Sequence, residues 1–276
     1  MSNRFDGTYY KHQSNGRTVA VIAGSAADCA FVQIITERAS RCLRYPLADF
    51  SAGDTVRIGG SMFSKRGIKL DIDRDGVSIH GAIAYAGLTP LKYDVMGPLK
   101  YVPMQCRHRI VSLRHSLNGS LELDGEILDF TGGTGYIEGD SGTSFPRDYA
   151  WVQCGGFPEN ACIVASAADI PFAGLHPRGC IGVVYIGGVE YRIATYLGGH
   201  AVRCDERRLT LRQRGLLLDI AIEPGAGHAL LAPQRGGMER EIHERAACSA
   251  RFRFVRDGEV LFDRTSDGAS VEIMQK

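Results

Sequence analysis

The residues best suited to chemistry lie in one glycine-rich stretch, GYIEGDSGTSFP at residues 135–146, which contains no lysine and no histidine. Tyr136, Glu138 and Asp140 occupy every second position within it. In an extended chain, side chains two residues apart point to the same side. The phenol and the two carboxyls would then converge on one face, as the groups of an acid–base site do. A glycine-rich turn whose carboxylates accept backbone N–H bonds is the alternative explanation.

The sequence lacks the common motifs of nucleotide, metal and hydrolase sites. Gly133, Gly135 and Gly139 do not have the G-x-G-x-x-G spacing, and G-K-[ST], H-E-x-x-H and G-x-S-x-G do not occur. His108 and His115 are seven residues apart, which places them on opposite faces of a strand and argues against joint metal ligation. We therefore expect neither a cofactor nor a metal ion.

Length, composition and charge describe an ordinary globular protein. The 276 residues are 44% hydrophobic and 23% charged, enough for one large core or two moderate ones. The 32 Lys and Arg residues nearly balance the 31 Asp and Glu residues. Because no strong positive field results, nucleic acid is not an expected partner.

The cysteines and the beginning of the chain indicate a cellular compartment. Eight cysteines are scattered, never as C-x-x-C, in apolar contexts such as DCAFVQI and RGCIGVV. This pattern is typical of reduced, buried thiols. The stretch MSNRFDGTYYKHQ lacks the apolar core of a signal peptide, and no apolar run approaches the ~18 residues of a membrane-spanning helix. The expected location is the cytoplasm.

Alternation of apolar and other residues predicts β-strands along most of the chain. The alternating positions are Ile68, Leu70, Ile72; Val77, Ile79, Ile83, Tyr85; Leu121, Leu123; Tyr191, Ile193; Leu216, Leu218, Ile220, Ile222; Phe252, Phe254; Val260 and Phe262. Two-residue hairpin turns are expected at Asp75-Gly76, Asp124-Gly125, Gly187-Gly188 and Asp257-Gly258. The sheets should therefore be antiparallel and the fold all-β.

So many strands exceed one small sandwich, and two barrels or sandwiches are the economical arrangement. Prolines in GPLKYVPMQC at residues 97–106 suggest the boundary, giving domains 1–105 and 106–276. MEREIHERAAC at residues 238–248 is rich in helix formers and is the best candidate for a short helix. A weak repeat, FDGTYYKHQ and FTGGTGYIEGD, could open one barrel each.

The segment GYIEGDSGTSFPRDYAWVQCGGF at residues 135–157 resembles the corresponding segment of tocopherol cyclase. The matching positions are Tyr136, Glu138, Gly142, Phe145, Pro146, Trp151 and Gln153. A looser similarity links the chain to the carotenoid 1,2-hydratases, whose H-x-W and Y-x-D motifs correspond to residues 115–117 and 136–138. The chain differs at residues 139–141, where the cyclase has lysine, asparagine and tryptophan, and at Leu117, where the hydratases have tryptophan.

This resemblance implies two lipocalin-like β-barrel or half-barrel domains, packed side by side, that hold an isoprenoid chain near their junction. It also implies cofactor-free chemistry, in which an acid protonates an alkene and a phenol oxygen or water captures the carbocation. A buried carboxyl suits this task because burial raises a carboxyl pKa by up to ~3–5 units. Aromatic faces can stabilise the cation by ~0.5–2 kcal/mol each. The expected function is that of a cyclase or hydratase acting on a prenylated hydrophobic compound.

The resemblance assigns roles to individual residues. Glu138 or Asp140 is the expected acid, with Tyr136 beside it and His115 as a proton relay. The expected substrate contacts are Trp151, Tyr10, Lys11, Phe145 and Gln153. Buried structural roles for the histidine and the tryptophan are the alternatives.

Two other functions use the same kind of apolar cavity. A non-catalytic lipid carrier needs only an apolar lining, whereas a catalyst needs a carboxyl buried at the cavity wall. A pericyclase-like enzyme of secondary metabolism would fold a polyene without any acid. In each case the expected partner is a hydrophobic prenyl ligand, and peripheral contact with a membrane during ligand uptake is compatible with all three.

Overall fold

The computed structural model describes residues 3–171 and 177–275, and these form an almost purely β structure. Within these residues, the helical segments are the 3-10 turns η1 (Leu47–Asp49), η2 (Gly97–Tyr101) and η3 (Thr195–Leu197). Neighbouring strands in both sheets run antiparallel. The prediction of an all-β antiparallel fold with little helix is confirmed.

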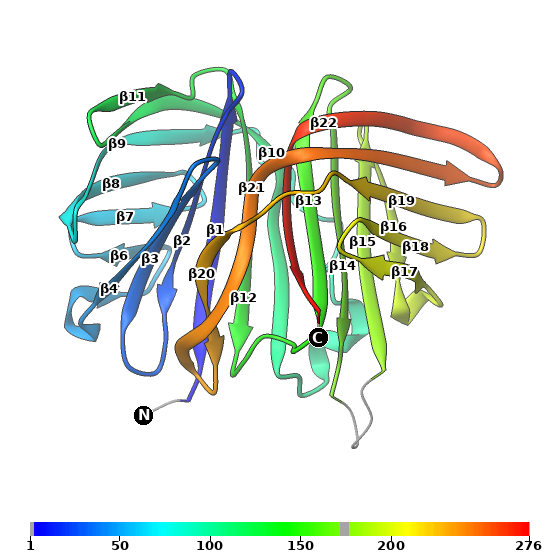
Figure 1. The fold of residues 1–276 in the computed structure, drawn as a ribbon, viewed down its shortest axis with the longest axis horizontal. Coiled ribbons are helices and arrows are strands. Elements are labelled where there is room, and N and C mark those ends of the chain that lie inside the picture. Colours follow the sequence, from blue (N-terminus) through cyan, green and yellow to red (C-terminus); the bar gives the residue numbers. More distant parts are fainter. Residues whose placement is uncertain (1–2, 172–176, 276) are drawn as a thin grey trace. The chain divides into compact units, whose positions relative to one another are not determined.

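The first sheet has the strand order β4-β3-β2-β1-β12-β10-β9-β8-β7-β6-β5, with β11 beside β10. Its strands are β1 (Phe5–Ser14), β2 (Arg17–Ser25), β3 (Ala30–Thr36), β4 (Ser40–Tyr45), β5 (Phe50–Ser51), β6 (Thr55–Ile58), β7 (Ser61–Ser64), β8 (Gly67–Arg74), β9 (Val77–Ala86), β10 (Cys106–Leu123), β11 (Glu126–Asp129) and β12 (Thr134–Gly142). Figure 1 shows β6 to β9 running across β1 to β3. Leu43 of β4 and Ile58 of β6 belong to the same apolar core, so the sheet curls around that core.

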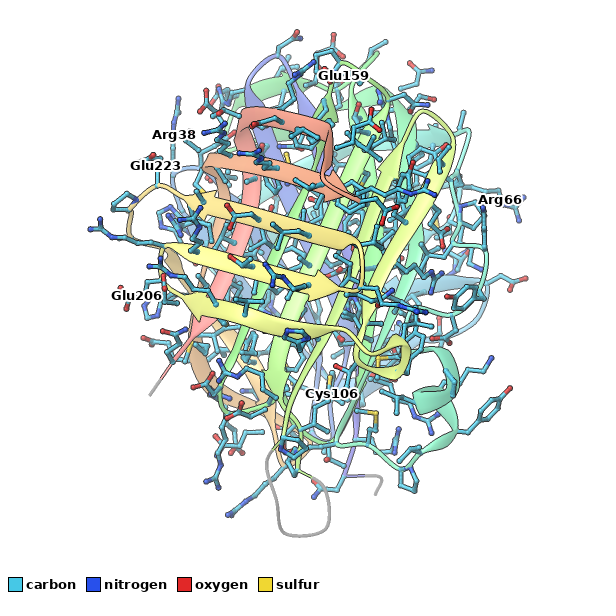
Figure 2. All side chains as sticks on the ribbon, turned by 90° about the vertical axis from the view of Figure 1, so that its right-hand side faces the viewer. Arg38, Arg66, Cys106, Glu159, Glu206 and Glu223 are labelled. Atoms are coloured by element: carbon cyan, nitrogen blue, oxygen red, sulfur yellow. The ribbon has the colours of Figure 1, made fainter. Side chains whose placement is uncertain are left out.

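The second sheet has the order β16-β15-β14-β13-β22-β21-β19-β18-β17, with β20 beside β21. Its strands are β13 (Tyr149–Phe157), β14 (Ala161–Asp169), β15 (Arg178–Ile186), β16 (Val189–Ala194), β17 (His200–Asp205), β18 (Arg208–Gln213), β19 (Leu216–Ile222), β20 (His228–Gln234), β21 (Gly237–Arg256) and β22 (Glu259–Met274). Figure 2 shows the yellow strands β17 to β19 lying across the green strands. Residues of both strand sets, such as Ile163 and Leu211, share one core.

The chain forms two compact units that are interleaved in sequence. The first contains residues 1–91, 108–144 and 230–241, and the second contains residues 92–107, 145–229 and 242–276. The predicted division had a single boundary, at 105/106. The difference arises because β12 pairs along the whole of β1, far earlier in the chain. The two halves of the weak repeat lie in β1 and β12, so they are neighbours in one unit and do not open separate barrels.

The hairpin turns follow the prediction. In each predicted pair both residues have positive φ, from 49° to 92°. This is the backbone of a type I′ turn, which asparagine, aspartate and glycine tolerate best. The alternating apolar positions also lie in strands, from β8 to β22.

The predicted helix at residues 238–248 is wrong, because these residues belong to strand β21. Burial alternates along this strand: Met238 and Ile242 are buried, whereas Glu239 and Glu241 are exposed. Helix propensity differs among these residues by only tenths of a kcal/mol each, and the pairing of β21 with β20 and β22 outweighs it.

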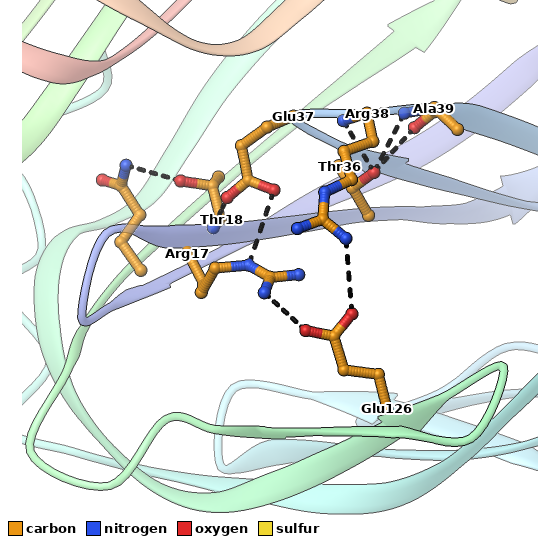
Figure 3. A network of polar contacts seen from close by, with 8 residues as sticks. Arg17, Thr18, Thr36, Glu37, Arg38, Ala39 and Glu126 are labelled. Carbon is orange, nitrogen blue, oxygen red and sulfur yellow. Dashed lines mark hydrogen bonds and ion pairs between the residues drawn. The ribbon is translucent and has the colours of Figure 1, made fainter.

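Surface ion pairs join three hairpins at one end of the first unit (Figure 3). Glu126, at the start of β11, accepts a hydrogen bond from Arg17 at 2.5 Å and lies 3.6 Å from the guanidinium of Arg38. Glu37 accepts a hydrogen bond from the backbone N–H of Thr18. The β1–β2, β3–β4 and β10–β11 turns are thereby held together. Exposed pairs of this kind contribute about 0.2–1 kcal/mol each.

The cysteines are free thiols, as the sequence predicts. Four are buried and four are half-buried, and none forms a disulfide. Separately, in residues 3–171 and 177–275 no helix has the length and apolar character needed to cross a lipid bilayer.

Candidate active site

Strand β12 presents the central residues of the candidate site. Its residues alternate between two faces, and Ile137 faces the apolar core of the first unit. Tyr136 and Glu138 therefore lie on the opposite face, where they are 2% and 5% exposed. Asp140 follows on the same face and is half-buried. From the sequence, this stretch could be either an acid–base site or a glycine-rich turn. It is a strand, and its three polar side chains share one side.

A chain of polar contacts connects these residues to a histidine of β10. The hydroxyl of Tyr136 donates a hydrogen bond to Oε2 of Glu138. The imidazole of His108 lies between the two carboxyls, with Nε2 at 3.4 Å from Oε2 of Glu138 and Nδ1 at 3.0 Å from Oδ1 of Asp140. The Nδ1 contact is a hydrogen bond. The Nε2 contact lacks hydrogen-bond direction and is electrostatic.

The two carboxyls determine the charge of His108. Burial lowers the pKa of this imidazole, but the negative charges of Asp140 and Glu138 outweigh burial and raise the pKa to about 9. The imidazole is therefore protonated at neutral pH. The site stores one proton on a nitrogen that faces the buried carboxyl of Glu138.

The same three side chains could also hold a metal ion. One atom each from His108, Glu138 and Asp140 lies within 4.8 Å of the others, and a mixed nitrogen and oxygen donor set is one that divalent cations accept. However, each ring nitrogen of His108 faces a different carboxyl. A metal would have to replace the proton on one nitrogen and draw both carboxylates towards it, so the geometry present favours an ion-paired imidazolium.

His115 lies on the other face of β12. A Cβ added at Gly135 would be 2.2 Å from Nε2 of His115, so the imidazole rests against the glycine on the core-facing side. Nδ1 of His115 lies 3.2 Å from the hydroxyl of Ser112, and the ring packs 4.5 Å from that of Tyr85. Burial lowers the pKa of His115 to about 4. The structure does not bring His115 together with Glu138.

His12 extends this second polar cluster inside the first unit. Its Nδ1 lies 3.0 Å from the carbonyl of Val19, an acceptor only, so Nδ1 carries the proton. Nε2 then accepts a hydrogen bond from the hydroxyl of Tyr85 at 2.6 Å. Burial lowers the pKa of His12 to about 3. Because His12 and His115 are both neutral at physiological pH, they carry no acidic imidazolium proton to donate to an alkene.

The neighbouring residues on β1 have opposite orientations. Tyr10 belongs to the apolar core, where burial raises its pKa to about 12. Lys11 is the Cα partner of Tyr136 in the β1–β12 pair, and it is 1% exposed. Of these two predicted substrate contacts, Lys11 thus shares the face of Tyr136 and Glu138, and Tyr10 does not.

The remaining predicted residues belong to the second unit. Trp151 and Gln153 are 8% and 0% exposed, on the face of β13 opposite its core residues. Trp151 is the Cα partner of Glu272, which accepts a hydrogen bond from Tyr149. The ring of Phe145 packs edge-on against Tyr149 at 6.0 Å. The second unit therefore also buries polar and aromatic side chains outside its apolar core.

Sequence reasoning missed the role of His108. We considered it only as a joint metal ligand with His115, and predicted that the two lie on opposite faces, as they do. No local pattern links His108 to carboxyls 30 residues later, because the pairing of β10 with β12 is a long-range contact.

No protein-family model matches the chain, and no curated protein matches it. Several solved structures do match the chain. CghA aligns over 100% of this chain and 90% of its own, with a TM-score of 0.66 at 10% identity. Kievitone hydratase from Nectria haematococca aligns over 99% and 88%, with a TM-score of 0.55 at 13% identity. An AttH protein from Nitrosomonas europaea aligns over 98% and 91%, with a TM-score of 0.53 at 11% identity. At these identities the likeness shows a shared fold.

Proposed function

We propose that this protein is an acid-catalysed hydratase or cyclase that acts on an isoprenoid or prenylated hydrophobic compound without a cofactor. The observation that carries the proposal is the pairing of Glu138 with His108. A buried carboxyl lies 3.4 Å from Nε2 of an imidazole whose pKa is raised to about 9. Such a pair holds a proton at neutral pH and can pass it to a substrate.

In the proposed reaction, the carboxyl of Glu138 donates its proton to one carbon of an alkene. The π electrons form the new C–H bond, and the neighbouring carbon becomes a carbocation. A water oxygen or a phenol oxygen of the substrate then forms the C–O bond, and its proton returns to the carboxylate of Glu138. Water gives hydration and an internal phenol gives cyclisation. Atoms and charge balance in both cases without an oxidant.

The neighbours of Glu138 have distinct parts in this scheme. While protonated, His108 favours the carboxylate of Glu138 that forms when the proton leaves. The proton released by the water or phenol then restores the carboxyl. Asp140 holds His108 by the hydrogen bond to Nδ1. Tyr136 holds the carboxyl through its hydroxyl, and its ring offers a face to a carbocation.

Two likenesses support the substrate class. The segment from Tyr136 to Gln153 resembles tocopherol cyclase, and proteins named kievitone hydratase and CghA have the same fold. Because one fold serves many functions, the fold alone does not assign the activity. Of the predicted substrate contacts, Lys11 shares the face of Tyr136 and Glu138 within the first unit.

The test separates proton transfer from binding. Glu138→Gln keeps the shape of the side chain but cannot donate an acidic proton. With a prenylated substrate that the unmodified protein converts, turnover should fall by about 10²–10⁴ while ligand affinity changes little. Glu122→Gln, an exposed glutamate of the same sheet, is the matched control and should leave both unchanged. Normal turnover in Glu138→Gln and in Asp140→Asn would show that the acid mechanism is wrong.

A pH profile tests the part of His108. Because its folded pKa is raised to about 9, kcat should decline as the pH rises through 9 and the imidazolium is lost. His108→Gln should remove this decline and lower kcat at neutral pH. If the unmodified protein binds prenyl lipids without converting any, the carrier function is correct. If it converts polyenes at rates indifferent to Glu138 and His108, the pericyclase-like function is correct.

A further inference from the structure

The segment that joins β9 to β10 carries aromatic side chains into solvent. Tyr93 and Tyr101 are 48% and 79% exposed, although tyrosine usually buries its ring. Leu197, in η3, is 42% exposed and lies close by, because η2 and η3 are packed together. We call residues 92–101 together with η3 the η2 platform. All of it belongs to the second unit.

Buried contacts fix the η2 platform to its sheet. Arg192 of β16 is 8% exposed, and its guanidinium donates hydrogen bonds to the carbonyls of Tyr93 at 2.5 Å and Asp94 at 3.0 Å. The same guanidinium lies 3.6 Å from the ring centroid of Tyr93. Glu190 pairs with Arg192 and also accepts the backbone N–H of Lys92. The ring of Tyr93 and the start of the platform are therefore held in place and are not part of a loose loop.

A second anchor sets η3 against η2. The hydroxyl of Tyr196 donates to the carbonyl of Val95 at 3.0 Å. Its ring covers Gly97, where an added Cβ would be 2.6 Å from ring atoms, and Gly97 has a φ of 54° that favours glycine. This contact brings the exposed Leu197 to the edge of the platform.

The η2 platform and the six residues that follow η2 carry a net positive charge. Residues 92–107 contain Lys92, Lys100 and Arg107 but a single acid, Asp94, so their net charge is +2, whereas the whole chain has +1. Asp94 is engaged within the platform, since its carboxylate accepts the backbone N–H of Met96 at 2.8 Å. The ammonium of Lys100 lies 5.0 Å from the ring of Tyr101.

We propose that the η2 platform docks on the surface of an anionic lipid bilayer. Tyrosine rings favour the headgroup region of a membrane, and each lysine or arginine near an anionic surface strengthens binding by about fivefold. Ile127, the most exposed of the large apolar side chains outside the platform in the described residues, at 72%, lies opposite Glu122 and next to Glu126, where an anionic surface would be repelled. The inference does not depend on the proposed catalytic function.

Vesicle flotation tests the docking. The full-length protein should bind vesicles with about one-third phosphatidylserine and bind phosphatidylcholine vesicles weakly, because the lysines need anionic headgroups. Binding should fall as salt rises from about 0.1 M to about 1 M, since screening shortens from ~10 Å to ~3 Å. Tyr101→Ser should weaken binding by about tenfold, and Lys92→Glu with Lys100→Glu by at least as much.

The control is Ile127→Ser, which removes an equally exposed apolar side chain and should leave flotation unchanged. Melting curves establish that each variant is folded. Absence of binding to anionic vesicles, equal binding to both vesicle types, or an equal loss in Ile127→Ser would overturn the proposal. Concentration-dependent dimers that disappear in Tyr101→Ser, without vesicle binding, would assign the surface to a second copy of the chain and would also overturn it.

Discussion

Replacing Gly135 by alanine tests whether His115 packs against the core-facing side of β12. The added Cβ would lie 2.2 Å from Nε2 of His115 and 2.7 Å from Cδ2 of Leu117. Ordinary contact begins at 3.4 Å, so the imidazole must move by about 1.2 Å. Both neighbours are 2% exposed and cannot move into solvent. Ile137 and Glu138 keep their faces in this variant, because the backbone stays extended.

The cost follows from the contacts that the movement disturbs. Overpacking of a buried site costs about 1–3 kcal/mol. Loss of the bond between His115 and Ser112 adds about 1 kcal/mol. Alanine recovers about 0.5–1 kcal/mol because it restricts the unfolded chain more than glycine does. We therefore expect Gly135→Ala to lower the free energy of unfolding by about 1–3 kcal/mol.

Urea unfolding at neutral pH measures this change. Gly53→Ala is the control, since a Cβ there meets nothing closer than 3.8 Å, and it should be nearly neutral. In a His115→Ala background the same Gly135→Ala substitution should cost much less. A neutral effect of Gly135→Ala, or an equal cost in both backgrounds, would refute the placement of His115 against β12.

Four further results are expected. Because the folded pKa values of His12 and His115 are lowered to about 3 and about 4, the unfolded chain binds more protons below pH 6.5; stability should fall by up to about 5 kcal/mol by pH 4.5 in urea titrations. His108 acts oppositely, since its raised pKa gives stability that is full below pH 6.5 and is lost as the pH rises through about 9. Dialysis against a chelator should leave turnover unchanged; loss restored by a divalent ion would place a metal between His108 and Asp140. Long prenyl chains should bind more tightly than short ones in calorimetry, by ~25 cal/mol per Å² of apolar surface buried, and equal affinities would contradict an apolar pocket.

The strands and turns could be predicted because their signals are local. Alternation over a few residues places Ile68 or Phe252 in a strand core, and an Asp-Gly pair accepts the positive φ of a hairpin turn. The prediction of a helix at 238–248 was wrong because the signal that decides this structure is not local. These residues favour a helix weakly, but pairing with the whole strands β20 and β22, which a window of eleven residues does not include, decides the structure of β21.

The interleaved units and the partner of Glu138 could not be predicted. Both depend on which strands pair: β1 with β12 puts the beginning of the chain beside Glu138, and β10 supplies His108. The family resemblance assigned the relay to His115, which is nearer in sequence to Glu138 but lies on the other face. Strand register therefore determines which histidine meets the carboxyl.

The glycines of GYIEGD leave space for neighbouring side chains on one face of a strand. Gly135 makes room for His115, and a Cβ at Gly139 would lie 2.6 Å from the guanidinium of Arg109. Both side chains belong to β10, so the two glycines let β10 side chains lie against β12 on the core-facing side. Glu138, between them in sequence, points the other way and meets His108 of the same β10 strand. One strand pair thus keeps a neutral imidazole on one face and a protonated imidazole on the other. The difference follows from the carboxyls, since burial alone would make both imidazoles neutral.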